Sequence, residues 1–145
     1  MTASLQETYP TVESRVNRLS EALENQYRGY HKRMIVRNSE GEMSEYSKGQ
    51  LAALENGTAK LMKFRVASGR KYYKLIQQDY DTFRDRNEYR DGSVHAFIDK
   101  KTGEVYKPAG WQAPAKHVRY ELMNDESFQT CIEHCDWAGG YLYMR

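Results

Sequence analysis

The stretch S-V-H-A-F-I-D-K-K-T-G-E-V-Y-K-P-A-G-W, residues 93–111, decides the fold. Apolar residues recur at every second position from Val94 onward, which is the period of a half-buried strand. The turn that follows contains Gly103, which adopts positive φ at little steric cost. Extended structure then resumes and ends at Pro108, which cannot donate to a sheet ladder. This stretch therefore predicts a β-hairpin from Val94 to Lys107.

A second hairpin is predicted upstream. Alternation of the same kind starts at Met62, a glycine-containing turn follows at residues 67–70, and a partner strand runs to Ile76. Between the two hairpins, residues 78–92 carry charges of both signs and are long for a structureless loop. We interpret them as a long exposed hairpin arm; a solvated loop without a partner is the alternative. The two hairpins together predict an antiparallel meander of about four strands.

Three helices are predicted around this sheet. Residues 12–31 form the longest, because apolar side chains recur at spacings of three and four, with charged side chains opposite. Packing on a sheet is the preferred use of this stripe, and a short coiled-coil seam is the alternative. A short middle helix runs from the capping residue Ser47 to Glu55. A third helix begins at a cap formed by Asn124 or Asp125.

The remaining segments are assigned from local composition. Residues 1–10 are expected to be a flexible N-terminal arm, and residues 33–37 have a preference for β structure. Residues 117–123 are ambiguous between strand and helix, and residues 141–143 are expected to add a terminal strand. The prediction is one α+β domain over residues 1–145, with helices segregated against an antiparallel sheet.

Composition narrows the class of protein. The chain has 145 residues, and its 12 tyrosines argue against a disordered chain. Its net charge is only +2, so a basic surface must come from segregation of the charges. No run approaches the roughly 20 apolar residues of a membrane span, and two cysteines do not make a secreted disulfide framework. We therefore expect a soluble protein of the intracellular type.

Motifs for catalysis or metal binding are weak in this sequence. Cys131, His134 and Cys135 form C-x-x-H-C, but a structural zinc site needs four ligands. Both cysteines also fall on the apolar stripe of the predicted third helix, where small buried cysteines are common. His95 is interpreted as a core-edge histidine rather than a catalytic base. With no phosphate-binding loop or nucleophile elbow, we expect no enzymatic activity, no cofactor and no metal.

Aromatic residues interleaved with cations are the remaining chemical signal. Aromatic rings stack on unpaired bases for about 1–3 kcal/mol per base, and lysines and arginines contact phosphates. Consecutive residues of a strand point to opposite faces, so Tyr72 and Tyr73 cannot share one face and some rings must be core. No duplex-reading motif is apparent, which favours single-stranded DNA. The predicted nucleic-acid site consists of Arg70, Lys71, Tyr72, Lys74, Phe97, Lys100, Lys101, Tyr106, Lys107 and Trp111.

Two stretches of the sequence resemble a known family. The run V-H-A-F-I-D-K-K-T-G-E-V-Y-K-P-A-G-W-Q-A-P-A-K at residues 94–116 and D-W-A-G-G-Y-L-Y at residues 136–143 resemble Drc-type proteins. These are DNA-binding RNA polymerase cofactors of podophages that carry a virion RNA polymerase. A-L-E-N-G-T-A at 53–59 and S-G-R-K-Y-Y-K-L at 68–75 add to the resemblance. It implies a protein of the infected host's cytoplasm that binds single-stranded DNA without sequence specificity, self-associates, recruits the phage polymerase and is not an enzyme.

Two other classes of function stay open. One is a protein-interaction module that never contacts DNA, and the other is a virion component whose tyrosine-rich faces are subunit interfaces. A homo-oligomer is expected for a DNA-binding protein, because one small platform covers few nucleotides and multivalency multiplies weak sites.

Overall fold

The structure is a computed structural model that describes residues 10–39 and 41–143, so most of the expected N-terminal arm lies outside the described residues. The strands form one antiparallel sheet in the order β1-β2-β3-β4-β5, which confirms the meander and adds a fifth strand within the ambiguous residues 117–123. The strands are β1 (Lys63–Ser68), β2 (Tyr72–Asp81), β3 (Glu88–Asp99), β4 (Glu104–Tyr106) and β5 (Tyr120–Glu121).

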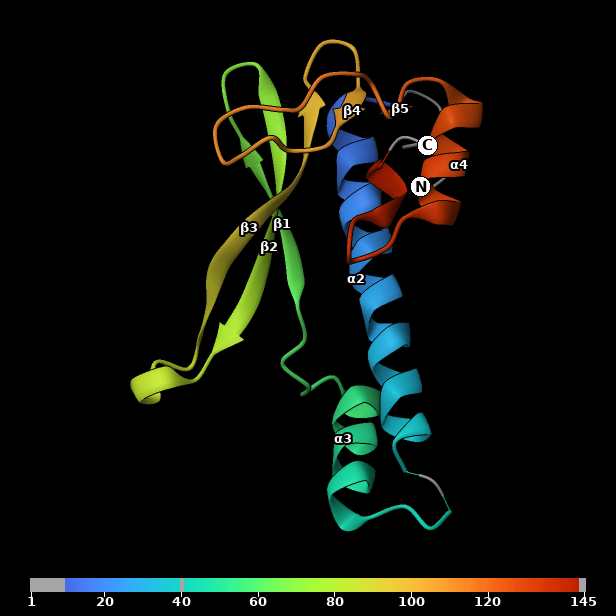
Figure 1. Ribbon diagram of the computed structural model, residues 1–145, viewed down its shortest axis with the longest axis vertical. Coiled ribbons are helices and arrows are strands. Elements are labelled where there is room, and N and C mark those ends of the chain that lie inside the picture. Colours follow the sequence, from blue (N-terminus) through green and yellow to red (C-terminus); the bar gives the residue numbers. More distant parts are fainter. Residues whose placement is uncertain (1–9, 40, 144–145) are drawn as a thin grey trace, which may run out of the picture.

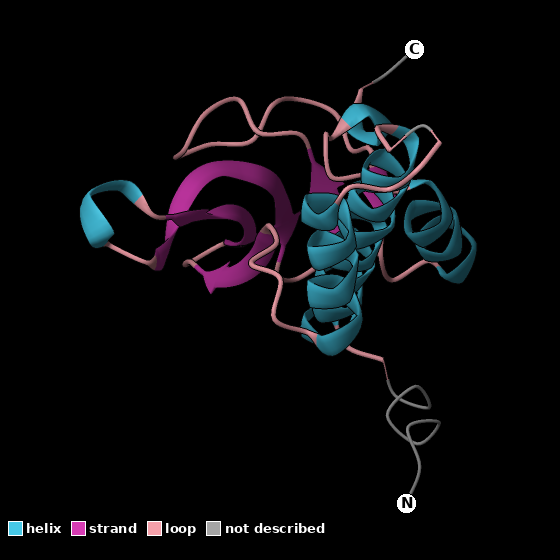
Figure 2. Cartoon of the chain, turned by 90° about the horizontal axis from the view of Figure 1, so that it is seen from below, coloured by secondary structure: helices cyan, strands magenta, loops and turns pink. Residues whose placement is uncertain are grey.

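Three α-helices accompany the sheet, which confirms the α+β class (Figure 1). They are α2 (Val12–Arg37), α3 (Glu45–Asn56) and α4 (Asp125–His134). Both α2 and α4 lie on one side of the sheet, and α3 lies beside the far end of α2 (Figures 1 and 2). None of the helices in the described part of the chain is long and apolar enough to cross a membrane.

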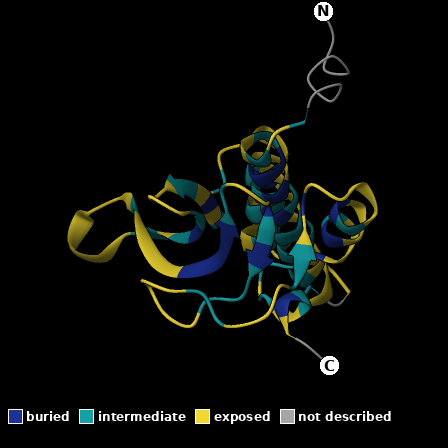
Figure 3. Ribbon diagram, turned by 90° about the horizontal axis from the view of Figure 1, so that it is seen from above, coloured by how far each residue is buried: buried dark blue, intermediate teal, exposed yellow. Residues whose placement is uncertain are grey.

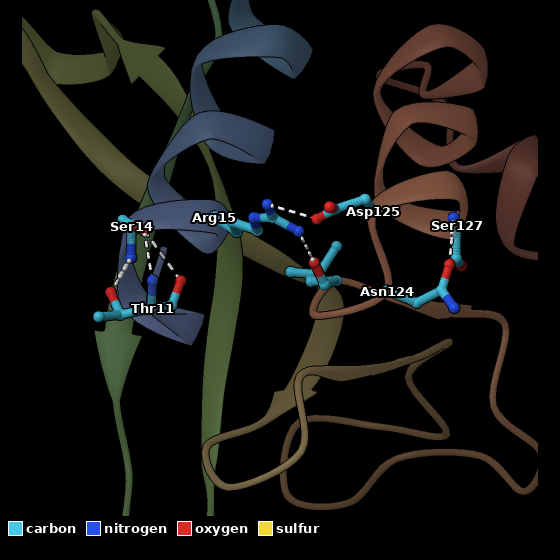
Figure 4. A network of polar contacts seen from close by, with 7 residues as sticks. Thr11, Ser14, Arg15, Asn124, Asp125 and Ser127 are labelled. Carbon is cyan, nitrogen blue, oxygen red and sulfur yellow. Dashed lines mark hydrogen bonds and ion pairs between the residues drawn. The ribbon is translucent and has the colours of Figure 1, made fainter. Parts of the chain in front are cut away.

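The long helix α2 begins as predicted and ends later. Thr11 and Ser14 form a capping box, in which each side-chain oxygen accepts a 3.0 Å hydrogen bond from the other's backbone N–H (Figure 4). The helix continues to Arg37, so the expected β structure at residues 33–37 is wrong. Packing overrides the local preference there, because Ile35 is buried where α3 lies alongside.

The main core lies between α2, the sheet and α4. The apolar stripe of α2 supplies Val16, Leu19 and Leu23, which are completely buried against side chains of the sheet and of α4. This helix also covers the free edge of β1. Ser20 Oγ donates to the Phe64 carbonyl oxygen at 2.5 Å, while the Phe64 N–H donates to the side chain of Glu24. The edge is thereby protected from pairing with another chain.

A buried arginine joins α2 to α4 (Figure 4). Arg15 Nη1 donates to the Leu122 carbonyl oxygen at 2.7 Å, and Nη2 lies 2.8 Å from a carboxylate oxygen of Asp125. Its guanidinium also lies 4.4 Å from the centre of the Phe128 ring. One cation therefore connects the start of α2 to the start of α4.

Strand β3 departs from simple alternation. Leu75 of β2 pairs with Ala96, but the next residue, Ile76, pairs with Val94, so His95 is an extra residue at a β-bulge. A bulge changes which face the following side chains occupy. Val94 therefore packs with Ile76 and Phe97 in a second small cluster, and not with Ala96 as the alternation predicts.

Two local expectations are corrected. The middle helix is capped by Ser44, whose Oγ accepts a hydrogen bond from the backbone N–H of Ser47, so Ser47 lies inside the helix. Residues 141–143 do not form a strand. The chain instead makes a short 3₁₀ helix (Gly140–Leu142), because Leu142 is inserted into the core and its N–H bonds back to the Gly139 carbonyl oxygen.

Candidate nucleic-acid interface

Two hairpin turns meet at one end of the sheet. The turn between β1 and β2 is closed by a hydrogen bond from the Gly69 N–H to the Tyr72 carbonyl oxygen. The Lys100 N–H, in the turn between β3 and β4, donates at 3.0 Å to the Lys71 carbonyl oxygen. We call the four cations that these turns carry, Arg70, Lys71, Lys100 and Lys101, the turn cluster. A main-chain bond thus holds together two residues that lie 29 positions apart in the sequence.

The rings beside the turn cluster lie on the outer face of the sheet, defined as the face that carries Ile76, Val94 and Phe97 and is opposite α2. Tyr72 and Tyr106 are half-buried, with ring centres 6.3 Å apart at 82°. Tyr72 also makes an edge contact with the ring of Phe97 at 5.6 Å. Part of each tyrosine side chain is therefore accessible to a ligand.

Phe97 is a predicted site residue that the structure places in the core. Its exposure is 0%, and the rings of Tyr72 and Tyr106 pack against it. A base cannot stack on a ring that solvent does not reach. We therefore correct the prediction: Phe97 supports the two tyrosines and is not itself a contact.

The loop between β4 and β5 folds over the outer face. It is closed by a hydrogen bond of 2.7 Å from the Ala115 N–H to the Lys107 carbonyl oxygen. Lys74 Nζ donates at 2.5 Å to the carbonyl oxygen of Trp111, whose side chain is 43% exposed. This bond places Trp111 next to β2. Lys107, in contrast, lies with its Nζ 4.7 Å from the ring of Tyr143, so it belongs to a different part of the surface.

Carboxylates balance the turn cluster only in part. Burial acts to raise the pKa of Asp99, but the N–H groups of Lys101 and Thr102 outweigh it and hold that pKa below its usual value. Glu104 is occupied by the hydroxyl of Tyr106, which donates to it at 3.2 Å. Lys100 Nζ lies 5.0 Å from the centre of the Tyr73 ring, on the α2 side of the sheet, where the hydroxyl of Tyr73 donates to Glu13. The side chain of Lys100 therefore lies on the other side of the sheet from Tyr72 and Tyr106, and the four cations of the turn cluster outnumber Asp99, Glu104 and Glu13 by one.

The other candidate residues are structural. His95 is 8% exposed, and its Nε2 lies 2.9 Å from the hydroxyl of Tyr141. Burial lowers the pKa of His95 to about 4, although Asp136 acts to raise it. Cys131 and Cys135 are free and buried. Across the described residues, no group of three or more potential ligands could hold a metal ion.

Sequence reasoning missed a further group of rings and cations at the other end of β2 and β3. Lys63 Nζ lies 4.2 Å from the ring of Tyr89, and Tyr89 lies 5.2 Å from Tyr80. Phe83, at the tip of the arm, is 61% exposed. The strand register places Tyr80 and Tyr89 opposite each other. Aligning the two halves of residues 78–92 as paired strands would have predicted this contact from the sequence.

The fold and this surface define a small α+β protein with an antiparallel meander and an aromatic, cationic outer face. The chain belongs to DUF7717, a family of unknown function, whose model matches residues 2–144. Neither a curated protein nor a solved structure matches the chain.

Proposed function

We propose that this protein binds single-stranded DNA through the turn cluster and the neighbouring rings of Tyr72, Tyr106 and Trp111. The main-chain bond from Lys100 to Lys71 carries the proposal, because it assembles four cations from two separate hairpins. Cations held in this way can contact successive phosphates, while half-exposed rings stack on unpaired bases. Both contacts are independent of base sequence.

A single strand suits this surface better than a duplex. Reading a duplex requires an element that enters a groove, whereas stacking requires bases that are already unpaired. The rings of Tyr72 and Tyr106 are held by edge contacts with neighbouring rings and are only partly exposed. They can therefore stack on a base, but they do not extend from the surface to contact the edges of paired bases. We therefore propose binding that tolerates any sequence and weakens with salt.

The resemblance to Drc-type proteins extends this proposal. It supports a role as a transcription cofactor of a phage, acting in the host cytoplasm, self-associating on DNA and recruiting the phage RNA polymerase. The polymerase and the other copies of the chain are proposed as partners from the sequence motifs alone. The turn cluster supports DNA binding and no other partner. No catalytic step is proposed.

Charge reversal in the turn cluster tests the proposal. The double variant Lys71→Glu, Lys101→Glu is expected to lower the affinity for a labelled single strand at least about tenfold, or 1.4 kcal/mol, in fluorescence anisotropy. The control variant Lys32→Glu, Lys48→Glu changes the net charge equally, on exposed positions of α2 and α3 at the other end of the molecule. Equal affinities of both variants and the wild type would refute the site.

A protein-interaction module is the second candidate, and two exposed apolar side chains favour it. Val36, in the last turn of α2, is 52% exposed, and Tyr46, in the first turn of α3, is 76% exposed. Such side chains are typical of protein interfaces when they lie together. In this case the protein would not bind DNA, and its association would respond only weakly to salt.

A further inference from the structure

The β2–β3 hairpin extends beyond the rest of the sheet as an arm. The pairing of β1 with β2 starts at Lys63 and Gln78, and beyond this point β2 and β3 continue alone. The two strands end in a 3₁₀ turn (Phe83–Asp85) that projects from the molecule (Figures 1 and 2). Every residue from 82 to 88 is exposed (Figure 3). The tip therefore contributes nothing to the core.

The tip is nevertheless held in one shape by Asp81. One carboxylate oxygen accepts the Phe83 N–H at 2.8 Å, and the other accepts a 3.2 Å hydrogen bond from Arg86 and lies 3.5 Å from Arg90. The bond from the Phe83 N–H, together with these arginines, holds the pKa of Asp81 below its usual value. Asp81 thus remains ionised and keeps its partners at neutral pH.

The backbone of the tip is strained. Arg84, Asp85 and Asn87 all have positive φ, between 48° and 60°. This conformation costs a residue with a Cβ roughly 1–2 kcal/mol. Strain of this kind persists where surrounding bonds enforce it, and it is concentrated at functional positions. Asp and Asn adopt this conformation more readily than other residues with a Cβ, so the strain is greatest at Arg84.

The enforced shape places two cations beside one exposed aromatic ring. The guanidinium carbons of Arg84 and Arg86 lie 5.1 and 5.7 Å from the ring centre of Phe83. The ring is 61% exposed, so it is accessible for stacking, and both arginines lie close enough to the ring to reach the phosphates of a strand whose base stacks there. This combination matches the chemistry of an unpaired nucleotide.

Further ring–cation pairs lie along the arm between its tip and the rest of the sheet. Lys60 Nζ lies 5.5 Å from the ring of Tyr80, and Lys63 Nζ lies 4.2 Å from the ring of Tyr89. By the strand register these rings lie on the same outer face as Tyr72. The nine residue steps from Tyr72 to Asp81 span about 30 Å of strand. Rings and cations therefore recur along the whole hairpin.

We propose that the tip of the arm, formed by Phe83, Arg84 and Arg86, is a second contact for the same single strand. Phe83 stacks on a base, and the two arginines contact the adjacent phosphates. The inference rests on the proposed DNA binding at the turn cluster, and it adds a site about 30 Å away that only a longer strand reaches. The acidic residues Asp85 and Glu88 lie on the same tip and reduce its attraction for phosphate.

Strand length separates the two sites experimentally. The wild type and Phe83→Ala are compared by anisotropy on labelled thymidine strands of about 4 and about 16 nucleotides, the range of site sizes for single-strand binders. Phe83→Ala is expected to weaken binding of the long strand by about 5- to 150-fold, which is the affinity that stacking of one base contributes. Binding of the short strand should be unaffected. Phe83→Trp should retain the affinity, and Tyr46→Ala, which removes an even more exposed ring on α3, is the matched control.

The outcomes distinguish this inference from the proposed function. If Phe83→Ala binds the short strand and the long strand as tightly as the wild type does, the second contact is overturned and the proposed site at the turn cluster is unaffected. If Phe83→Ala instead lowers the oligomer mass in light scattering without changing DNA affinity, the tip binds another copy of the chain and the inference is wrong. If the wild type binds neither strand, the proposed function falls, and the second contact falls with it. The double variant Asp85→Asn, Glu88→Gln should strengthen binding of the long strand; weaker binding would contradict the inference.

Discussion

The buried arginine between α2 and α4 allows a quantitative prediction. Replacement Arg15→Met keeps the apolar stem but removes the hydrogen bond to the Leu122 carbonyl oxygen and the cation over Phe128. A hydrogen bond from a charged group contributes about 1.5–3 kcal/mol, and a ring–cation contact about 0.5–2 kcal/mol. The ion pair with Asp125 adds little, because that carboxylate is 89% exposed. We therefore expect Arg15→Met to lower the free energy of unfolding by about 3 kcal/mol.

Urea denaturation measures this loss as a shift of the midpoint at an unchanged slope. The control is Asp125→Asn, which removes only the exposed partner and should cost less than about 1 kcal/mol. Asp125 opens α4, so the amide also tests any effect of charge at the helix terminus. The reasoning would be refuted if Arg15→Met cost under about 0.5 kcal/mol, or if both variants cost the same.

Three further predictions concern binding, pH and reactivity. Tyr72→Ala should weaken single-strand binding by about 5- to 150-fold in anisotropy, whereas Phe97→Ala should instead cost about 3–5 kcal/mol of stability in urea. The pKa of His95 is 6.5 in the unfolded chain and about 4 in the folded protein, so the unfolded state binds the proton first as the pH falls. The free energy of unfolding should therefore drop by about 3 kcal/mol between these two pH values. His95→Gln should flatten this pH dependence in urea titrations at several pH values. Burial raises the pKa of Cys131 to about 12 and of Cys135 to about 11, so a thiol reagent should label them only on unfolding, and immediate labelling of the native protein would contradict their burial.

Regular periodicity made much of the fold predictable. The stripe of α2 and the two hairpin turns each follow from neighbouring residues, and so does the cap at Asn124, whose side chain accepts the Ser127 N–H at 2.9 Å. These features depend on local spacing and turn chemistry. Long-range packing matters little to them, so the sequence alone was sufficient.

The deviations arise from contacts between distant residues. The bulge at His95 leaves no mark in the alternation, yet it decides which face Val94 occupies. The length of α2 depends on packing beside α3, and the 3₁₀ turn at Leu142 depends on a place in the core. Local preference cannot anticipate these effects, because each is set by a partner far away in the chain.

The candidate site shows the same division. Its cations were identifiable from their positions in turns, because turn residues are exposed. The burial of Phe97 beneath Tyr72 and Tyr106 was not, since it requires the register of three strands. The main-chain bond from Lys100 to Lys71 likewise became visible only in the fold.

The salt dependence of single-strand affinity tests the central claim most directly. Each phosphate contact on a single strand contributes a slope of about −0.7 to the logarithm of affinity against the logarithm of salt concentration. On a strand too short to reach the tip of the arm, four cations of the turn cluster, each on one phosphate, predict a slope of about −2.8 for the wild type. An absence of binding at low salt, or an affinity that does not change with salt, would contradict the account.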